Sequence, residues 1–98
     1  MATLPADEVR SRLNSLSGWT LSGGELTRQF TFAGFAEAVA FIVRLGFAAE
    51  SVDHHPDLLV NYKRVTVTYS THSEGGLTVK DFEGAQSATG IATGMGGK

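Results

Sequence analysis

The stretch GFAEAVAFIVRLGFAAE, residues 34–50, decides the fold that this sequence predicts. Almost all of it is Ala, Val, Phe, Ile or Leu, and we expect it to form the main helix. Glu37 and Arg44 are seven residues apart, so they share one narrow polar line on that helix. A helix this apolar must be covered on more than one side. A sheet can cover one side, and the other side requires a partner.

Strand patterns lie on both sides of this helix. The four predicted strands cover residues 19–21, 26–32, 58–62 and 65–70. In the second of them Leu26, Phe30 and Phe32 share one face, with Arg28 as the exception. In the fourth, apolar and polar side chains alternate strictly, which is typical of a half-buried strand. One face of the sheet is therefore expected to be core and the other polar.

A helix is predicted near each end of the chain. Pro5 and the acids that follow it suit the first turn of a helix over about residues 5–15. Thr78 and Asp81 match a capping box that opens the last helix, which we expect to decay near Gly90. Residues 91–98 are expected to form a loose tail.

The element order is therefore α-β-β-α-β-β-α, which places the chain in the α+β class. We expect two layers, an antiparallel four-stranded sheet with helices on one face. A length of 98 residues without a linker or an internal repeat predicts a single domain over residues 1–98.

Composition excludes several classes of function. The chain is globular, with 42 % hydrophobic and 18 % charged residues, and a net charge of −2 without a basic cluster argues against nucleic-acid binding. The absence of cysteine excludes disulfides, thiolate zinc sites and a cysteine nucleophile. Residues 1–8 lack the apolar core of a secretory signal, and the longest apolar run, residues 35–49, is too short to span a membrane. We therefore expect a soluble cytoplasmic protein.

The chain's three histidines fall in one region that is flanked by acids. The set comprises His54, His55 and His72, with Glu50, Asp53, Asp57 and Asp81 nearby. Imidazole titrates near neutral pH, so it is the side chain best suited to proton transfer there. The residues alone leave open whether the cluster is catalytic or a set of ordinary surface histidines.

Metal binding and nucleophilic catalysis are the competing site chemistries. Zinc motifs usually place two ligands on one face of an element, whereas the adjacent His54 and His55 diverge in an extended segment before Pro56. Hydroxyls surround His72, but the chain has no glycine-framed G-x-S-x-G elbow. We therefore expect neither a metal site nor a nucleophilic serine.

The residues near the histidines also have ordinary structural explanations. Asp81 can cap a helix, and Trp19 can be a core aromatic at the start of a strand. Glu50 and Asp53 can be solvated residues at a helix end.

Three sequence blocks together resemble the pterin-4a-carbinolamine dehydratase family. They are residues 49–57 with an acid followed by Asp-His-His-Pro, residues 65–72 with the alternating strand that ends at His72, and residues 76–81 with Gly-Leu-Thr-x-x-Asp. Gly18-Trp19 and residues 30–35 also resemble the family, so the resemblance covers about residues 4–90. Leu58 departs from it, because many members carry an aromatic residue there, and the glycine-rich end after Gly90 is unlike the family.

This resemblance implies a hydro-lyase that dehydrates 4a-hydroxytetrahydropterin to quinonoid dihydropterin by histidine acid–base catalysis. The reaction recycles a pterin cofactor used by an aromatic amino acid hydroxylase, and it needs neither a metal nor an organic cofactor. By the resemblance, His54 and His72 form the proton-transfer pair, and His55 binds and orients the pterin. Five further residues would bind the substrate or support the histidines: Glu50, Asp53, Pro56, Trp19 and Asp81. Of these, Trp19 would line the wall of the pocket.

We also expect a homo-oligomer, either a dimer or a tetramer. The main helix has two apolar rows, Phe35, Val39, Ile42 and Gly46 in one and Ala36, Ala40, Val43 and Phe47 in the other. One sheet face can hardly cover both rows. The alternative is that the terminal helices cover the second row within one chain.

The rival function is a dimerisation or coactivator-type binding module, which the family also contains. An RNA-binding module is disfavoured by the acidic balance.

Overall fold

The computed structural model describes residues 3–98, apart from the side chain of His72. Its elements are α1 (Ala6–Asn14), β1 (Thr20–Ser22), β2 (Glu25–Thr31), α2 (Phe35–Ser51), β3 (Asp57–Asn61), β4 (Arg64–Tyr69), the short 3-10 helix η1 (His72–Glu74) and α3 (Val79–Gly94). The predicted order α-β-β-α-β-β-α is confirmed, with η1 as an addition in the loop after β4.

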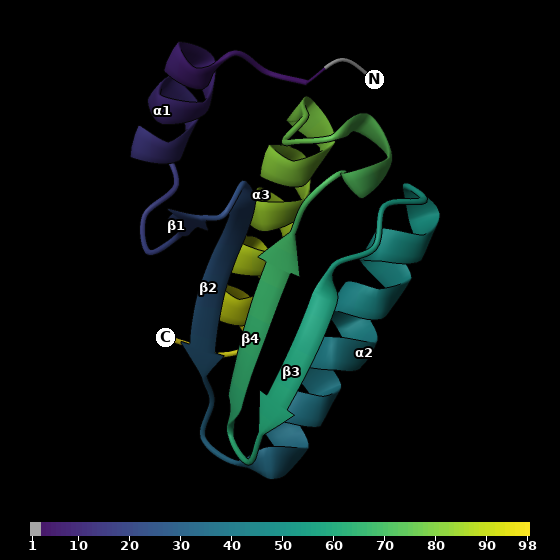
Figure 1. The fold of residues 1–98 in the computed structure, drawn as a ribbon. Coiled ribbons are helices and arrows are strands. Elements are labelled where there is room, and N and C mark those ends of the chain that lie inside the picture. The colour runs from purple at the N-terminus through teal and green to yellow at the C-terminus, as the bar shows by residue number, and fades with distance from the viewer. Residues whose placement is uncertain (1–2) are drawn as a thin grey trace.

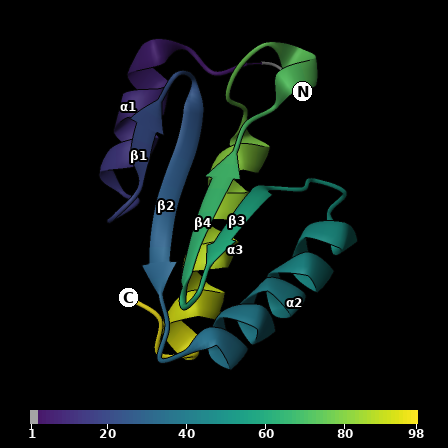
Figure 2. The same ribbon diagram turned by 60° about the horizontal axis from the view of Figure 1, so that its bottom comes forward.

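The four strands form one antiparallel sheet in the order β1-β2-β4-β3. The long helices α2 and α3 lie next to each other on one face of this sheet, and α1 lies beside β1 (Figures 1 and 2). The predicted α+β class with two layers is therefore confirmed.

The core lies between the sheet and the two long helices. Its strand residues are Leu26, Phe30, Val65, Val67 and Tyr69, all of which are buried. Arg28 points to the same side of the sheet as Leu26 and Phe30, yet it is only half-buried, at the edge of the core. Its Cζ lies 4.5 Å from the centroid of the Phe30 ring, and its Nη1 donates to the Ser17 carbonyl at 2.9 Å. The apolar stem of an arginine thus packs at the core edge while its charge keeps polar partners.

The apolar rows of α2 differ from the two that the sequence predicted. The row that packs into the core is Ala38, Phe41, Leu45 and Ala49, at helical spacing. The large residues that the prediction divided between two rows form one exposed face instead: Phe35, Val39, Val43 and Phe47 are 55, 40, 52 and 76 % exposed. Small alanines occupy core positions of α2, so side-chain size gave no guide to its buried side. The helix α3 packs beside α2 without covering the exposed face.

The loose tail predicted for residues 91–98 is wrong. The helix α3 continues past Gly90 to Gly94, with Ala92 buried in the core. The backbone of Lys98 then pairs with Thr31 through two hydrogen bonds, of 2.9 and 3.0 Å. This end of the chain occupies the part of the β2 edge that the short strand β1 leaves open (Figure 1). An unpaired strand edge is a row of free hydrogen-bonding groups, and this pairing satisfies part of that row.

Candidate active site

The end of α2 turns the chain so that two adjacent histidines face different elements. Val52 and His54 both donate backbone hydrogen bonds to the Ala49 carbonyl, at 3.3 and 3.2 Å. Between them Asp53 adopts a left-handed conformation with φ of +51°, a region that aspartate tolerates better than most residues. Beyond this turn the side chain of His54 contacts α3, whereas that of His55 contacts α2.

His54 is held by a buried carboxylate. Its Nε2 lies 2.6 Å from Oδ1 of Asp81, whose side chain is 0 % exposed, and the imidazole itself is 12 % exposed. Oδ2 of Asp81 accepts two more hydrogen bonds, from the Thr71 hydroxyl at 2.7 Å and from the Thr78 backbone N–H at 2.9 Å. The predicted capping box at Thr78 is confirmed, so one carboxylate both caps α3 and holds His54.

These contacts assign the tautomer of His54. An ionised carboxylate only accepts hydrogen bonds, so His54 Nε2 carries the proton and donates it to Asp81 Oδ1. In the neutral imidazole, Nδ1 is then the ring nitrogen that can accept a proton. A charge-assisted hydrogen bond of this kind is about twice as strong as a neutral one. Asp81 therefore orients the imidazole as well as fixing its tautomer.

A tyrosine from β4 stacks against this imidazole. The ring centroids of His54 and Tyr69 lie 5.8 Å apart, with 17° between the ring planes. Burial, reinforced by the negative charge of Asp81, raises the pKa of Tyr69 to about 12. The phenol therefore stays protonated at neutral pH. The sequence predicted Tyr69 only as part of an alternating strand, because inward parity does not distinguish a core residue from one that contacts a site.

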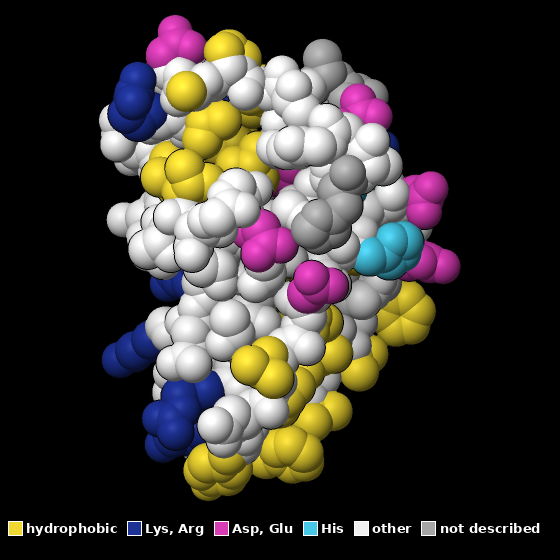
Figure 3. Space-filling model, viewed as in Figure 1, with side chains coloured by type: hydrophobic (Ala, Val, Ile, Leu, Met, Phe, Trp, Pro, Cys, Tyr) yellow, Lys and Arg dark blue, Asp and Glu magenta, His cyan; other side chains and the backbone are white. Residues whose placement is uncertain are grey.

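His55 forms a second histidine–carboxylate pair at the surface. Its Nε2 lies 2.6 Å from Oε1 of Glu50, and the two side chains are 54 and 78 % exposed. Figure 3 shows a histidine side chain among acidic ones on this side of the molecule. Unlike the buried pair, this pair is accessible to a large molecule from solvent.

The third histidine is described only by its backbone. His72 begins η1, and its side chain lies outside the described residues. The preceding Thr71 is held by three contacts. Its hydroxyl donates a hydrogen bond to Asp81 and accepts one from the Thr78 hydroxyl at 3.1 Å, and its backbone forms a β-bridge with Gly76. Asp81 therefore links His54 to the residue next to His72.

The other predicted site residues lie in different surroundings. Trp19 is buried in the core, where its Nε1 donates to the Thr89 hydroxyl at 2.8 Å and its ring packs on Tyr69. Tyr69 in turn stacks with His54, and Trp19 does not line the cavity beside His54, where we had expected a wall residue. Asp53 is exposed and Pro56 is half-buried, and both lie beside the two histidines.

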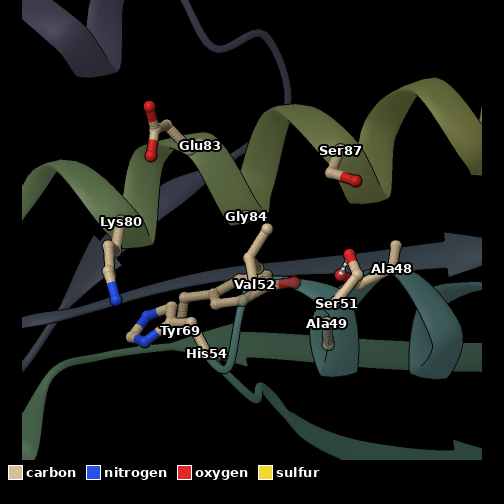
Figure 4. A pocket seen from close by; sticks show the side chains of 10 residues that line it. All are labelled: Ala48, Ala49, Ser51, Val52, His54, Tyr69, Lys80, Glu83, Gly84 and Ser87. Carbon is tan, nitrogen blue, oxygen red and sulfur yellow. Dashed lines mark hydrogen bonds between the residues drawn. The ribbon is translucent and has the colours of Figure 1, made fainter.

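A cavity of about 200 Å³ opens beside His54, between the end of α2 and α3. Figure 4 shows His54 and Tyr69 next to each other in its lining, below Lys80 and Glu83 of α3. Most of the lining is apolar, with Val52 from the end of α2 and Gly84 from α3 among its residues. The sequence gave no signal for this cavity, because its lining comes from elements distant in the chain.

Two absences hold for the part of the chain that the structure describes. Its His, Cys, Asp and Glu side chains form no group of three placed to hold a metal ion. Within the same part, none of the helices is long and apolar enough to cross a membrane.

The fold and the site together define a class of protein. It is a small two-layer α+β protein with a histidine held by a buried aspartate beside a cavity, an arrangement suited to proton transfer. The family follows from comparison with known proteins. A model of the family described as "Pterin 4 alpha carbinolamine dehydratase" matches residues 2–91, and the chain belongs to this family.

Relatives are similar over nearly the whole chain. One from Nostoc sp. is 47 % identical over 92 residues, which cover 93 % of this chain and 99 % of the relative. One from Roseiflexus sp. is 44 % identical over 84 residues, which cover 85 % and 90 %. Both bear the name "Putative pterin-4-alpha-carbinolamine dehydratase". A crystal structure of "transcriptional coactivator/pterin dehydratase" from Brucella melitensis matches with a TM-score of 0.88 and 37 % identity, over 92 % of this chain and 98 % of that one.

Proposed function

We propose that this protein is a hydro-lyase that dehydrates 4a-hydroxytetrahydropterin to quinonoid dihydropterin and water. The observation that most supports this proposal is the hydrogen bond of His54 to the buried Asp81 beside a cavity, in a chain of this dehydratase family. The reaction would recycle the pterin cofactor of an aromatic amino acid hydroxylase.

The chemistry requires two proton transfers. The substrate carries a hydroxyl on C4a and a proton on the adjacent N5. A base removes the N5 proton, the electron pair of that bond forms N5=C4a, and the C4a–O bond breaks as an acid protonates the departing oxygen. The products are water and quinonoid dihydropterin, and no oxidant or reductant is consumed. Each positioned acid or base typically contributes about 10²–10⁴-fold in rate.

The histidines take distinct roles in this proposal. His54 is the base, because Asp81 holds its Nε2 and leaves Nδ1 as the nitrogen that accepts a proton in the neutral ring. The Asp81 carboxylate also stabilises the imidazolium that forms when His54 takes the proton. His72 is the acid, by the family resemblance. His55, paired with Glu50 at the surface, binds and orients the pterin.

The direct test follows the dehydration of a 4a-hydroxytetrahydropterin by ultraviolet absorbance, with and without the purified protein. We expect the protein to accelerate dehydration above the spontaneous rate, and a chelator to leave the accelerated rate unchanged. The double variant His54→Ala/His72→Ala is the control for contaminating activity. A rate equal to the spontaneous one would overturn the proposal, and loss of activity on chelation would overturn its metal-free mechanism.

A dimerisation or coactivator-type binding module is the second candidate function. The exposed apolar face of α2 favours it, because a large apolar patch usually marks an interaction site. The similar Brucella melitensis structure is also titled a transcriptional coactivator. A chain that fails to turn over the carbinolamine while still forming a stable assembly through α2 would support this second function.

A further inference from the structure

The face of His54 has a restraint of its own, separate from the hydrogen bond at its edge. Asp81 contacts the imidazole only at Nε2, and a single hydrogen bond leaves the ring free to tilt about that contact. Tyr69 lies nearly parallel to the ring, with 17° between the planes, and an offset aromatic pair of this kind is favourable beyond the area that it buries. Edge and face contacts together restrain the orientation of the His54 ring.

The place of Tyr69 depends on a glycine in the middle of α3. A Cβ added at Gly84 would lie 2.4 Å from Cε1 and 2.6 Å from Cζ of the Tyr69 ring, closer than real Cβ contacts come. A glycine inside a helix is less favourable than an alanine, so the helix itself does not favour it there. Trp19 packs on the same tyrosine, with 6.2 Å between centroids. The tyrosine ring is therefore confined between the core and α3.

We propose that Tyr69 is a positioning residue for the reaction, whose ring holds the face of His54 while Asp81 holds its edge, and that Gly84 provides the space for this ring. The kinetic part of this inference rests on the proposed dehydratase function. The positioning part stands on geometry and is measurable in the protein without substrate.

The variants separate the ring of Tyr69 from its hydroxyl and from its bulk. Tyr69→Phe keeps the aromatic face, and Tyr69→Leu keeps apolar bulk without that face. Phe30→Leu is the matched control, because it removes another buried aromatic of the same sheet that does not contact His54. Gly84→Ala displaces the ring from the side of α3.

The first readout is the long-range ¹H–¹⁵N spectrum of the His54 ring, which distinguishes the two neutral tautomers. We expect the single Nε2–H form in the wild type, in Tyr69→Phe and in Phe30→Leu. In Tyr69→Leu and Gly84→Ala we expect a mixture of forms, because a ring that tilts away from Asp81 weakens the hydrogen bond that selects Nε2–H. The second readout is kcat. Misplacing a reacting group by about 1 Å costs up to about 100-fold, so we expect kcat to fall about 10–100-fold in Tyr69→Leu with little change in KM, and to recover in Tyr69→Phe.

A double-mutant cycle adds a test that folding losses do not imitate. If Gly84 acts through the tyrosine ring, Gly84→Ala has no further effect on the tautomer mixture in the Tyr69→Leu background. The proposal is overturned if Tyr69→Leu keeps the single tautomer, or if its kcat equals that of Phe30→Leu. A wild type without dehydratase activity whose His54 spectrum still responds to Tyr69→Leu would reject the proposed function and keep the positioning role.

Discussion

At the scale of single residues, the Asp81 carboxylate connects the fold to the site. Its Oδ2 accepts hydrogen bonds from Thr71 and Thr78, and its Oδ1 contacts His54. The capping pattern at Thr78 made Asp81 predictable as a structural residue, and the resemblance made it predictable as a supporting one. The sequence offered helix capping and contact with a histidine as alternative explanations of Asp81. The structure shows both contacts, because each carboxylate oxygen makes one of them.

Replacing Asp81 by asparagine tests the tautomer assignment. In Asp81→Asn an amide NH₂ can face His54, and Nε2 must then accept rather than donate, which moves the ring proton to Nδ1. We expect kcat for dehydration to fall about 10–1,000-fold, a loss of the size that a misdirected acid–base group gives. Asp7→Asn, which makes the same change in the first turn of α1, is the control. Equal rates for the two variants would contradict the assignment.

The two adjacent histidines are expected to fail in different ways. His54 is half-buried against Asp81 and is the proposed base, so His54→Ala should lower kcat about 10–1,000-fold. His55 is exposed on Glu50 and is the proposed pterin-binding residue, so His55→Ala should chiefly raise KM. Steady-state kinetics of both variants on the carbinolamine separate these effects. If both variants kept the kinetics of the wild type, the two histidines would have only a structural role.

The raised pKa of Tyr69 predicts a loss of stability at high pH. The folded protein binds the phenolic proton more tightly than the unfolded chain, because the pKa of Tyr69 is raised from 10.0 to about 12. Its contribution to stability is therefore fully present below pH 10 and is lost as pH rises through about 12. We expect the free energy of unfolding in urea to fall more steeply between these pH values for the wild type than for Tyr69→Phe. Parallel pH curves would show that the phenol is not desolvated.

At the scale of elements, helices and strands whose pattern has one apolar side were predictable. From Val65 to Tyr69 the strand β4 alternates between buried and half-buried residues, and the capping box marks the start of α3. The end of α3 was missed because the last part of the chain is rich in glycine, which usually ends a helix. The glycines concerned are Gly90, Gly94, Gly96 and Gly97. Their role depends on what surrounds each of them, which the sequence does not show.

Two of these glycines should respond in opposite directions to alanine. A Cβ at Gly97 would lie 2.6 Å from Cε1 of Phe32 and 3.0 Å from the Ala92 carbonyl, so Gly97→Ala should destabilise the fold by about 1–3 kcal/mol. Gly90 is exposed within α3 and has open space at its Cβ, so Gly90→Ala should stabilise by about 0.5–1 kcal/mol. Urea unfolding at one fixed protein concentration measures both. A stabilising Gly97→Ala would mean that the C-terminal segment is not packed on the core.

At the scale of the whole molecule, the layered architecture was predictable because element order and patterning restrict a short chain to few arrangements. The buried side of α2 was not predictable, since its core row contains two alanines, Ala38 and Ala49, while larger residues point outward. Periodicity finds the polar line of Glu37 and Arg44, but apolar residues on both sides of that line fit the same period. Only the contact with the sheet distinguishes the two sides.

The exposed face of α2 leads to the prediction of a homo-oligomer. Phe35, Val39, Val43 and Phe47 form an apolar stripe along this helix, and hydrophobic side chains gather over α2 at the lower right of Figure 3. Soluble monomers rarely expose apolar patches larger than a few hundred Å², so we expect a second copy of the chain to cover this stripe. Sedimentation at micromolar concentration should therefore give the mass of a dimer or a tetramer.

A charge placed in the stripe should dissociate that assembly. Val43→Asp would bury an unpaired carboxylate in the interface, at a cost of several kcal/mol, and each 1.4 kcal/mol raises the dissociation constant about tenfold. We expect this variant to sediment with the monomer mass and to keep the helical circular-dichroism signal of the wild type. Gln86→Asp adds the same charge at an exposed position of α3 and should leave the assembly intact. A wild type that sediments as a monomer would contradict the prediction, and the apolar stripe would then have to be covered by a different protein, as the coactivator-type function requires.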